Sequence, residues 1–256
     1  PSSTDLKKVE EGTQLLLGDI KSEKELEIQV EFQENVPLTI ARNGDHLHIT
    51  CQEPAHYYRG LNWAVHHSED TWNTKSEPVY FSKNGVMLDC SRNAVFTVEK
   101  VKSVIRTLAK MGMNVLMLYT EDTYEVPGEP YFGSYRGRYT KAEIQEMDAY
   151  ASMFGIELVP CIQTLAHLHN ALKWPGKNKI KDSTDVLIVG KEETYTFIEE
   201  LLQSVKEAFS TRRVHLGMDE AVLLGLGKYL KENGYEKGSV LMREHCKRVL
   251  AICKKL

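Results

Sequence analysis

Short runs in which apolar and polar residues alternate fill the first part of the chain, from about residue 12 to residue 52. The apolar positions of these runs are Leu26, Ile28, Val30, Phe32, Leu38, Ile40, Leu47, Ile49 and Cys51. Turn-forming residues separate the runs at 34–35 and at 43–45. Alternation with a period of two, interrupted by such turns, predicts antiparallel strands with one buried face.

After Pro54 the apolar spacing lengthens to Tyr58, Leu61 and Val65, which predicts a helix that covers this sheet. Residues 68–80 are mostly polar and predict a linker. We therefore expect a small α+β domain over residues 1–80.

From residue 85 onward, short apolar runs alternate with amphipathic segments. Strands are expected at 85–89, 114–119, 156–161 and 214–217, and helices at 97–112, 140–155, 192–209 and 240–253. Continuous apolar strands that alternate with helices predict a parallel sheet with helices packed on it. Four such units fit either a doubly wound sheet or part of a (β/α)8 barrel.

Polar side chains follow each of the four predicted strands. They are Asp89, Ser91 and Arg92, then Glu121 and Asp122, then Gln163, Thr164 and His167, and finally Asp219 and Glu220. The carboxyl ends of parallel strands meet at one edge of a sheet, so we expect these side chains to converge there. Glycine-rich nucleotide-binding motifs do not follow any of the strands, which disfavours a nucleotide site.

The adjacent carboxylates Asp219 and Glu220 are the sharpest local feature. Two carboxylates in one site suit glycoside cleavage, in which one donates a proton to the leaving oxygen and the other stabilises positive charge. Considered alone, the pair also fits the first turn of a helix, where acidic residues complement the helix dipole.

Three further residues, Arg92, His167 and Asp122, are candidates to act together with this acidic pair. Arg92 offers a forked donor for sugar hydroxyls, or else makes a surface salt bridge. His167, with Asp122 as its partner, could orient Glu220, or it could be a structural histidine. His167 and His169 also have the spacing of metal ligands, but the first strand lacks a second histidine pair, so a metal site is disfavoured.

The composition of the chain disfavours some classes of binding partner and indicates a cellular compartment. The chain carries 32 Lys and Arg against 36 Asp and Glu, a net charge of −4, which disfavours nucleic acid and anionic membranes as partners. Five widely spaced cysteines predict buried free thiols and a cytoplasmic protein. The chain begins at Pro1 without Met, which leaves secretion open.

Several motifs together resemble those of the family 20 glycoside hydrolases, the β-N-acetylhexosaminidases. They are Leu88-Asp89-Cys90-Ser91-Arg92-Asn93, Asn114-Val115-Leu116 running to Glu121-Asp122, Val159-Pro160-Cys161-Ile162-Gln163-Thr164-Leu165-Ala166-His167, and His215-Leu216-Gly217-Met218-Asp219-Glu220-Ala221. The stretches Tyr119-Thr120-Glu121-Asp122 and Arg136-Gly137-Arg138-Tyr139 look most like the branch that contains hexosaminidase D and small bacterial exo-hexosaminidases. The likeness covers roughly residues 85–225.

This resemblance implies a barrel and a substrate-assisted retaining mechanism, in which the acetamido oxygen of the substrate is the nucleophile. Asp219 would hold the acetamido N–H, and Glu220 would be the general acid and then the general base. Asp122 and His167 would position Glu220, and Arg92 would bind hydroxyls of the terminal GlcNAc or GalNAc. No metal or organic cofactor is implied.

The length limits this interpretation. A (β/α)8 barrel alone takes about 250 residues, whereas 171 residues follow Gly85. We therefore expect residues 81–256 to be the first half of a catalytic barrel, with little hydrolase activity by itself. The open sheet edges would need the missing half of the barrel or self-association to cover them. The alternatives are a carbohydrate-binding chain or pseudo-enzyme without turnover, and an unrelated metal-dependent barrel hydrolase.

Overall fold

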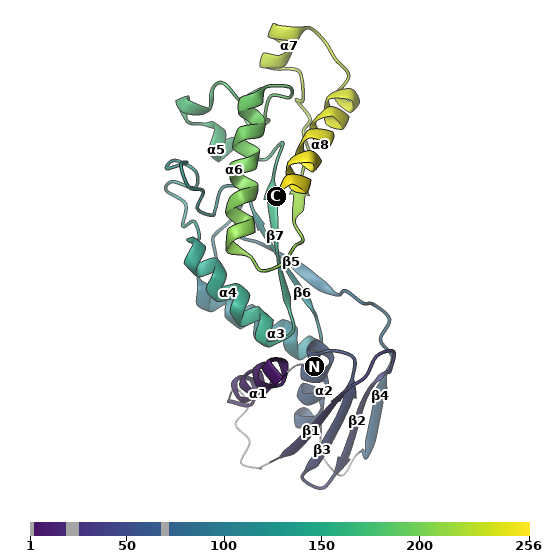
Figure 1. Ribbon diagram of the computed structural model, residues 1–256. Helices are drawn as coiled ribbons and strands as arrows, with labels where there is room; N and C mark the ends of the chain where they lie inside the picture. Colours follow the sequence, from purple (N-terminus) through teal and green to yellow (C-terminus); the bar gives the residue numbers. More distant parts are fainter. Residues whose placement is uncertain (1–2, 19–25, 68–71) are drawn as a thin grey trace. The chain divides into compact units, whose positions relative to one another are not determined.

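A computed structural model describes residues 3–18, 26–67 and 72–256 (Figure 1). The chain divides into two compact units. The first comprises Pro1–Val86, Thr97–Leu116 and Met147–Leu158, and the second comprises Met87–Phe96, Met117–Glu146 and Val159–Leu256. The domain boundary expected at residues 80 and 81 remains a prediction.

The first unit contains a mixed four-stranded sheet. Its elements are α1 (Ser3–Gly18), β1 (Glu27–Phe32), β2 (Leu38–Asn43), β3 (His46–Cys51), α2 (Pro54–His66) and β4 (Thr74–Glu77), with the strand order β1-β3-β2-β4. The three alternating runs expected from the sequence are β1, β2 and β3. In α2, a side chain at Gly60 would lie 3.1–3.4 Å from side chains of β2 and β3, so this helix lies directly on the sheet, as predicted.

The expectation of a purely antiparallel sheet is wrong for β1. This strand pairs in parallel with β3, with Ile28 opposite Leu47, whereas β2 pairs antiparallel with both β3 and β4. The reason is that β3 lies between β1 and β2, so the two strands joined by the turn at 34–35 are not neighbours. Alternation shows which residues face the core, but not which strands are adjacent.

Two further elements differ from the sequence prediction. Residues 12–18 belong to helix α1, in which Val9 and Leu16 are buried two turns apart. Part of the expected linker forms β4, a short edge strand of four polar residues that are alternately exposed and half-buried. Residues 68–71 of that linker lie outside the described ranges. Short polar edge strands carry almost no hydrophobic pattern, so the sequence does not show them.

The second sheet alternates with helices, as predicted. Its elements are β5 (Gly85–Asp89), α3 (Val98–Met111), β6 (Val115–Thr120), α4 (Lys141–Met153), β7 (Glu157–Gln163), α6 (Glu192–Ala208), β8 (His215–Gly217) and α8 (Gly238–Lys255). The strands lie in sequence order, β5-β6-β7-β8, and β7 pairs in parallel with β8. This is an α/β arrangement that brings the four strand ends into one row.

The expected helix caps are present. The Thr97 side chain accepts a hydrogen bond from the backbone N–H of Lys100 at the start of α3, and Gly112 ends this helix in the left-handed conformation. At the start of α4, Thr140 and Glu143 form a capping box, in which each side chain accepts a hydrogen bond from the other residue's backbone N–H. These caps fix where the segments between strands become helical.

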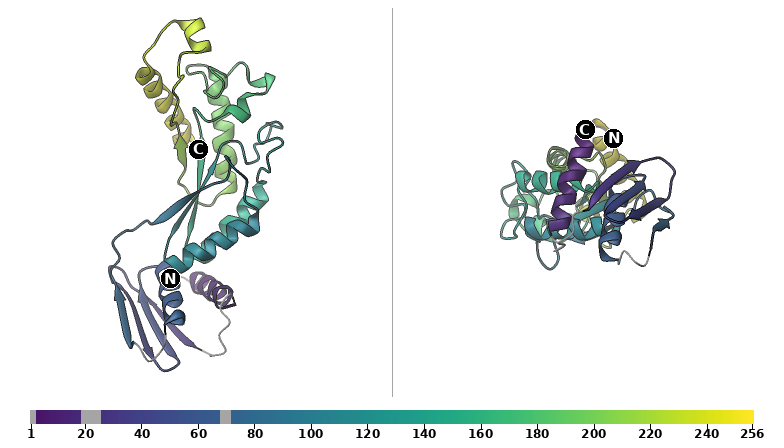
Figure 2. Two further views of the ribbon diagram at one scale, coloured as in Figure 1. Left: turned by 180° about the vertical axis from the view of Figure 1, so that it is seen from behind. Right: turned by 90° about the horizontal axis from the view of Figure 1, so that it is seen from below.

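Helices α6 and α8 lie side by side in the views of Figures 1 and 2, joined by ion pairs such as Arg248–Glu192 at 2.7 Å. Shorter helical segments, α5 (His169–Leu172), a 3-10 turn (Pro175–Lys177) and α7 (Lys228–Asn233), lie in the connections that follow β7 and β8. Within the described ranges, none of the helices is both long and apolar enough to cross a membrane.

Candidate active site

The turn that follows β8 carries both predicted carboxylates, and His167 lies against them. Its Nε2 atom is 3.4 Å from Asp219 Oδ2 and 3.4 Å from Glu220 Oε2. Asp219 and Glu220 form a turn rather than the start of a helix. The structure thus brings three predicted site residues together and places the acidic pair outside any helical first turn.

Two of these residues have a backbone conformation that side chains disfavour. His167 has φ +55° and Glu220 has φ +51°, both in the left-handed region. A non-glycine residue held there costs about 1–3 kcal/mol and persists only where the surrounding structure enforces it. The His167 loop is held by backbone hydrogen bonds from Leu168 to Asp185 and from Leu187 to Leu165. These bonds hold the backbone on both sides of His167, whose side chain lies against the turn after β8.

Gln163, the last residue of β7, links Asp219 to the neighbouring strand. Its Nε2 atom donates to Asp219 Oδ1 at 3.3 Å and to the hydroxyl of Tyr119 at 3.1 Å. Burial acts to raise the pKa of Asp219, but hydrogen bonds from its own backbone N–H and Gln163, with the charges of His167 and Arg92, lower it overall. Asp219 is therefore suited to remain a carboxylate.

Arg92 follows β5 and is held over an aromatic ring. Its guanidinium lies 4.7 Å from the centre of the Tyr119 ring and donates to the Tyr119 hydroxyl at 3.2 Å. Asp89 and Glu121 lie 3.4 Å and 4.0 Å from its nitrogens. The side chain remains half exposed, so part of its donor fork faces solvent.

Asp122 has a different partner from the one expected. Its Oδ1 atom lies 2.9 Å from Arg136 Nη1, and Arg136 also pairs with Glu121 at 3.6 Å. Burial raises the pKa of Asp122, and the charge of Arg136 offsets this only in part. The described side chains show no hydrogen bond or ion pair between Asp122 and His167. The role of Asp122 in positioning Glu220 therefore remains a prediction.

Arg136 also holds the loop after β5. Its Nη2 atom donates to the backbone carbonyl of Ser91 and, at 2.8 Å, to the Ser91 hydroxyl, which in turn donates to Glu121 at 2.9 Å. Gln163 and Glu121 follow predicted strands, yet sequence reasoning gave them no role, and Arg136 served only as part of a family motif. For Gln163 and Glu121, the position directly after a predicted strand could have indicated a role in the site.

A buried aspartate anchors the segment that follows Glu220. Asp182 accepts hydrogen bonds from the backbone N–H groups of Gly225 and Tyr229, each at 2.7 Å, and its backbone carbonyl accepts from Lys228 at 2.9 Å. A buried carboxylate that accepts backbone N–H groups is a strong, directional tether. Sequence analysis did not identify Asp182, which lies in a loop without a periodic pattern.

His245 connects α8 to the end of β7. Its Nε2 atom lies 2.8 Å from the carbonyl oxygen of Thr164, and its Nδ1 atom lies 3.4 Å from the Tyr195 hydroxyl. Since a carbonyl oxygen only accepts, Nε2 carries the proton and Nδ1 accepts from Tyr195. Burial lowers the pKa of His245 to about 4, so this fully buried imidazole is neutral near pH 7.

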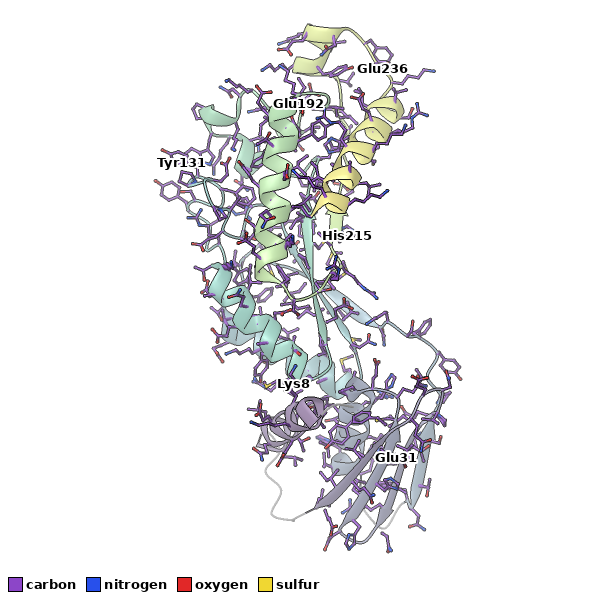
Figure 3. The ribbon with its side chains drawn as sticks, viewed as in Figure 1. Lys8, Glu31, Tyr131, Glu192, His215 and Glu236 are labelled. Carbon is purple, nitrogen blue, oxygen red and sulfur yellow. The ribbon has the colours of Figure 1, made fainter. Side chains whose placement is uncertain are left out.

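Cys161 in β7 lies beside His215, the first residue of β8, which is labelled in Figure 3. The Cys161 sulfur is 3.1 Å from His215 Nδ1. Burial raises the pKa of this thiol to about 11, the opposite of what a nucleophilic cysteine needs. Cys51, Cys90 and Cys161 are buried free thiols, while Cys246 and Cys253 are partly exposed.

Metal-ligating side chains are not grouped around His167 in an arrangement that could hold a metal ion, within the described part of the chain. Among the described residues, no group of three or more His, Cys, Asp and Glu side chains is placed to hold a metal ion. His169, the possible second ligand beside His167, begins helix α5.

Comparison with known proteins gives a consistent match. Residues 81–252 match the model of glycosyl hydrolase family 20, catalytic domain. A probable beta-hexosaminidase of Arthroderma benhamiae is 25% identical over 228 residues, which cover 74% of this chain and 36% of that protein. Hexosaminidase D of Bos taurus is 25% identical over 122 residues, which cover 46% of this chain and 35% of that protein. The chain thus spans about a third of the length of these relatives.

A solved structure shows the same fold. The exo beta-N-acetylglucosaminidase of Vibrio harveyi, solved in complex with N-acetylglucosamine, superposes with a TM-score of 0.77 at 17% sequence identity. The superposition covers 99% of this chain and 48% of that one.

Proposed function

The chain belongs to glycosyl hydrolase family 20, and we propose that it carries the catalytic pair of an exo-acting β-N-acetylhexosaminidase. The substrate would be a glycan with a terminal, non-reducing β-linked GlcNAc or GalNAc. The observation that carries this proposal is the cluster after β7 and β8, in which His167 lies 3.4 Å from both Asp219 and Glu220.

The family resemblance suggests a different role for each of the two carboxylates. Glu220 would donate its proton to the glycosidic oxygen while the acetamido oxygen of the substrate attacks C1 and the bond to the leaving group breaks. Asp219 would accept a hydrogen bond from the acetamido N–H and stabilise the positive charge of the resulting oxazolinium. Its lowered pKa suits this role, because the group must stay ionised. Glu220 would then take a proton from the water that attacks C1, while the bond between C1 and the acetamido oxygen breaks and the acetamido group is restored.

His167 is the positioning residue for this pair. Its imidazole reaches both carboxylates, so it can fix the orientation of Glu220 relative to Asp219. Asp122 would act one step further away, through Arg136, which holds Ser91 and Glu121 beside Arg92. Arg92 would bind hydroxyls of the terminal sugar with the exposed part of its guanidinium.

We propose in addition that the second sheet is the first half of a (β/α)8 barrel. Its strands lie in sequence order, as successive barrel strands do. The side chains of Asp219 and Glu220 are 56% and 75% exposed. A general acid gains a raised pKa from burial and from neighbouring charge, so we expect the 256-residue chain alone to hydrolyse weakly.

The alternative is a carbohydrate-binding protein without turnover, and the exposure of Glu220 is the observation that favours it. The finer assignment to the hexosaminidase D branch rests on Tyr119-Thr120-Glu121-Asp122, on Arg136-Gly137-Arg138-Tyr139, and on Cys161 in place of a carboxylate after Pro160. In the structure, Tyr119, Glu121 and Arg136 all lie around Arg92.

A leaving-group comparison tests the proposed acid. Hydrolysis of aryl N-acetyl-β-glucosaminides with good and poor leaving groups is measured for the 256-residue chain and for the naturally produced protein, each with and without Glu220→Gln. We expect the substitution to suppress cleavage of the poor leaving group far more than that of the good one, because only the former needs protonation. Equal activity of wild type and Glu220→Gln on the poor leaving group would exclude Glu220 as the acid.

A further inference from the structure

Three aromatic side chains form a cluster on the loops that follow β6 and β7, within the second unit. The ring centres of Tyr131 and Trp174 are 5.0 Å apart with an interplanar angle of 31°, and those of Tyr135 and Trp174 are 6.4 Å apart with an angle of 32°. The two tyrosines thus incline at similar angles to one shared indole. We call Tyr131, Tyr135 and Trp174 the aromatic platform.

The two tyrosines of the platform are unusually exposed. Tyr135 is 94% exposed and Tyr131 is 58% exposed, and Figure 3 shows Tyr131 at the outer edge of its loop, directed away from the neighbouring ribbon. Tyr135 also has φ +65°, a conformation that is costly for a bulky side chain. Adjacent exposed rings held at such a cost point to a binding surface.

The loops that carry the platform are fixed by their own contacts. The ion pair between Lys177 and Glu129 ties the loop after β7 to the loop after β6. Arg138 donates to the backbone carbonyl of Phe132, and the buried Phe132 ring packs edge-on against Tyr124 at 5.1 Å. The platform is therefore formed before any ligand arrives, which reduces the entropic cost of binding.

Some residues that lie close to the platform in the chain line a polar cleft. It has a volume of about 590 Å³ and is lined by Ser91, Arg92, Asn93, Ala94, Val95, Glu121, Arg136, Gly137 and Asn170. Arg136 and Gly137 directly follow Tyr135 in the chain. Asn170 accepts a hydrogen bond from Lys173 at 3.5 Å, and the Lys173 ammonium lies 5.2 Å from the Trp174 ring centre. The polar groups of Lys173 and Asn170 thus lie beside the Trp174 ring.

We propose that the platform is a glycan-binding surface, distinct from the Asp219–Glu220 pair, on which pyranose rings pack against Tyr131 and Tyr135. A pyranose presents an apolar C–H face that suits an aromatic ring and a rim of hydroxyls that suits polar donors and acceptors. The platform offers the aromatic faces, and Lys173 and Asn170 beside Trp174 offer the polar groups. The inference rests on the proposed function only for the kind of sugar, namely N-acetylhexosamine units.

The three tryptophans of the chain provide a direct test. N-acetylchitotetraose is titrated into the ¹⁵N-labelled 256-residue chain, and the indole N–H signals are followed, with Trp174 assigned through Trp174→Phe. We expect the Trp174 signal to shift with saturation, while those of Trp63 and Trp72, which lie in the first unit, stay in place.

Matched variants then localise the site. Tyr135→Ala and Tyr131→Ala should each raise the Kd reported by Trp174 by about two- to tenfold. Tyr235→Ala removes an equally bulky side chain that is 73% exposed elsewhere in the second unit, and it should change the Kd by less than about twofold. An unmoved Trp174 signal at millimolar sugar, or equal weakening by Tyr235→Ala, would overturn the proposal.

A further variant separates this inference from the proposed function. Glu220→Gln should leave the Trp174 titration unchanged, because the platform does not include the carboxylate pair. If the naturally produced protein fails to hydrolyse any N-acetylhexosaminide while Trp174 of the 256-residue chain still reports binding, the proposed activity is wrong and the platform stands. If the Trp174 titration disappears in Glu220→Gln, the sugar binds at the carboxylates and the platform proposal is wrong.

Discussion

The Nε2 atom of His167 lies 3.4 Å from Oε2 of Glu220, and both residues are held in the left-handed backbone region. The two residues belong to loops that follow neighbouring parallel strands, β7 and β8. The contact therefore depends on two separate loops, each held in a disfavoured conformation. The contact between His167 and Glu220 locates the candidate site in space, which the adjacency of Asp219 and Glu220 in the sequence does not.

His167→Ala should lower kcat/KM by up to about 100-fold, because Glu220 loses its positioning partner. The charge of His167 helps to lower the pKa of Asp219, so its removal should raise that pKa. If ionised Asp219 sets the acidic limb of the pH–rate profile, this limb should move to higher pH. His169→Ala serves as the control, and a profile that keeps its acidic limb in His167→Ala would argue against the contact.

His245 should make stability depend on pH between about 4 and 6.5. Burial lowers its pKa to about 4 in the folded state, while the unfolded state protonates near 6.5. As the pH falls through this window, the unfolded state binds a proton that the folded state does not, so the free energy of unfolding decreases by at most about 3 kcal/mol.

Urea unfolding of wild type and His245→Gln at several pH values measures this effect. The variant removes the titrating group while keeping an amide that can donate to the Thr164 carbonyl, which lies 2.8 Å from His245 Nε2. Its stability should vary less over the same window. Parallel pH curves for the two proteins would show that His245 titrates normally.

Asp182→Ala should loosen the segment after Glu220. It removes the acceptor of two backbone N–H groups, from Gly225 and Tyr229, and should cost about 3 kcal/mol. Amide hydrogen exchange at these two residues should accelerate. Asp182→Asn, which keeps one side-chain oxygen, should have an intermediate effect, and exchange rates unchanged in both variants would contradict the proposed tether.

The sequence predicted those parts of the fold that have a strong local pattern. The alternation in β2 and β3 and the amphipathic stretches in α3 and α6 mark their elements closely. The sequence did not predict helix α1, whose last residues, 12–18, fall in the region interpreted as alternating strands. It also did not predict strand β4, which is a polar edge strand. The direction of β1 depends on which strand lies beside it, a tertiary property that alternation does not encode.

The candidate site shows the same division. Residues that directly follow strands, such as His167 and Asp219, meet as the topology of parallel strands predicts. Arg136 is different, because it reaches Asp122 from the far end of the loop between β6 and α4. The course of that loop is set by contacts such as the one between Arg136 and Ser91. Short-range sequence patterns do not predict contacts between residues so far apart in the chain.

The central claim is that the substrate's acetamido oxygen acts as the nucleophile while Asp219 holds its N–H. The most direct measurement is the kcat/KM of the naturally produced protein on aryl glucosaminides whose N-acetyl group carries none, one, two or three fluorines. Fluorine withdraws electrons from the amide oxygen, so the account predicts a steep, progressive loss of rate along the series. A rate that does not depend on fluorination would contradict it, since a nucleophile supplied by the protein would not be weakened in this way.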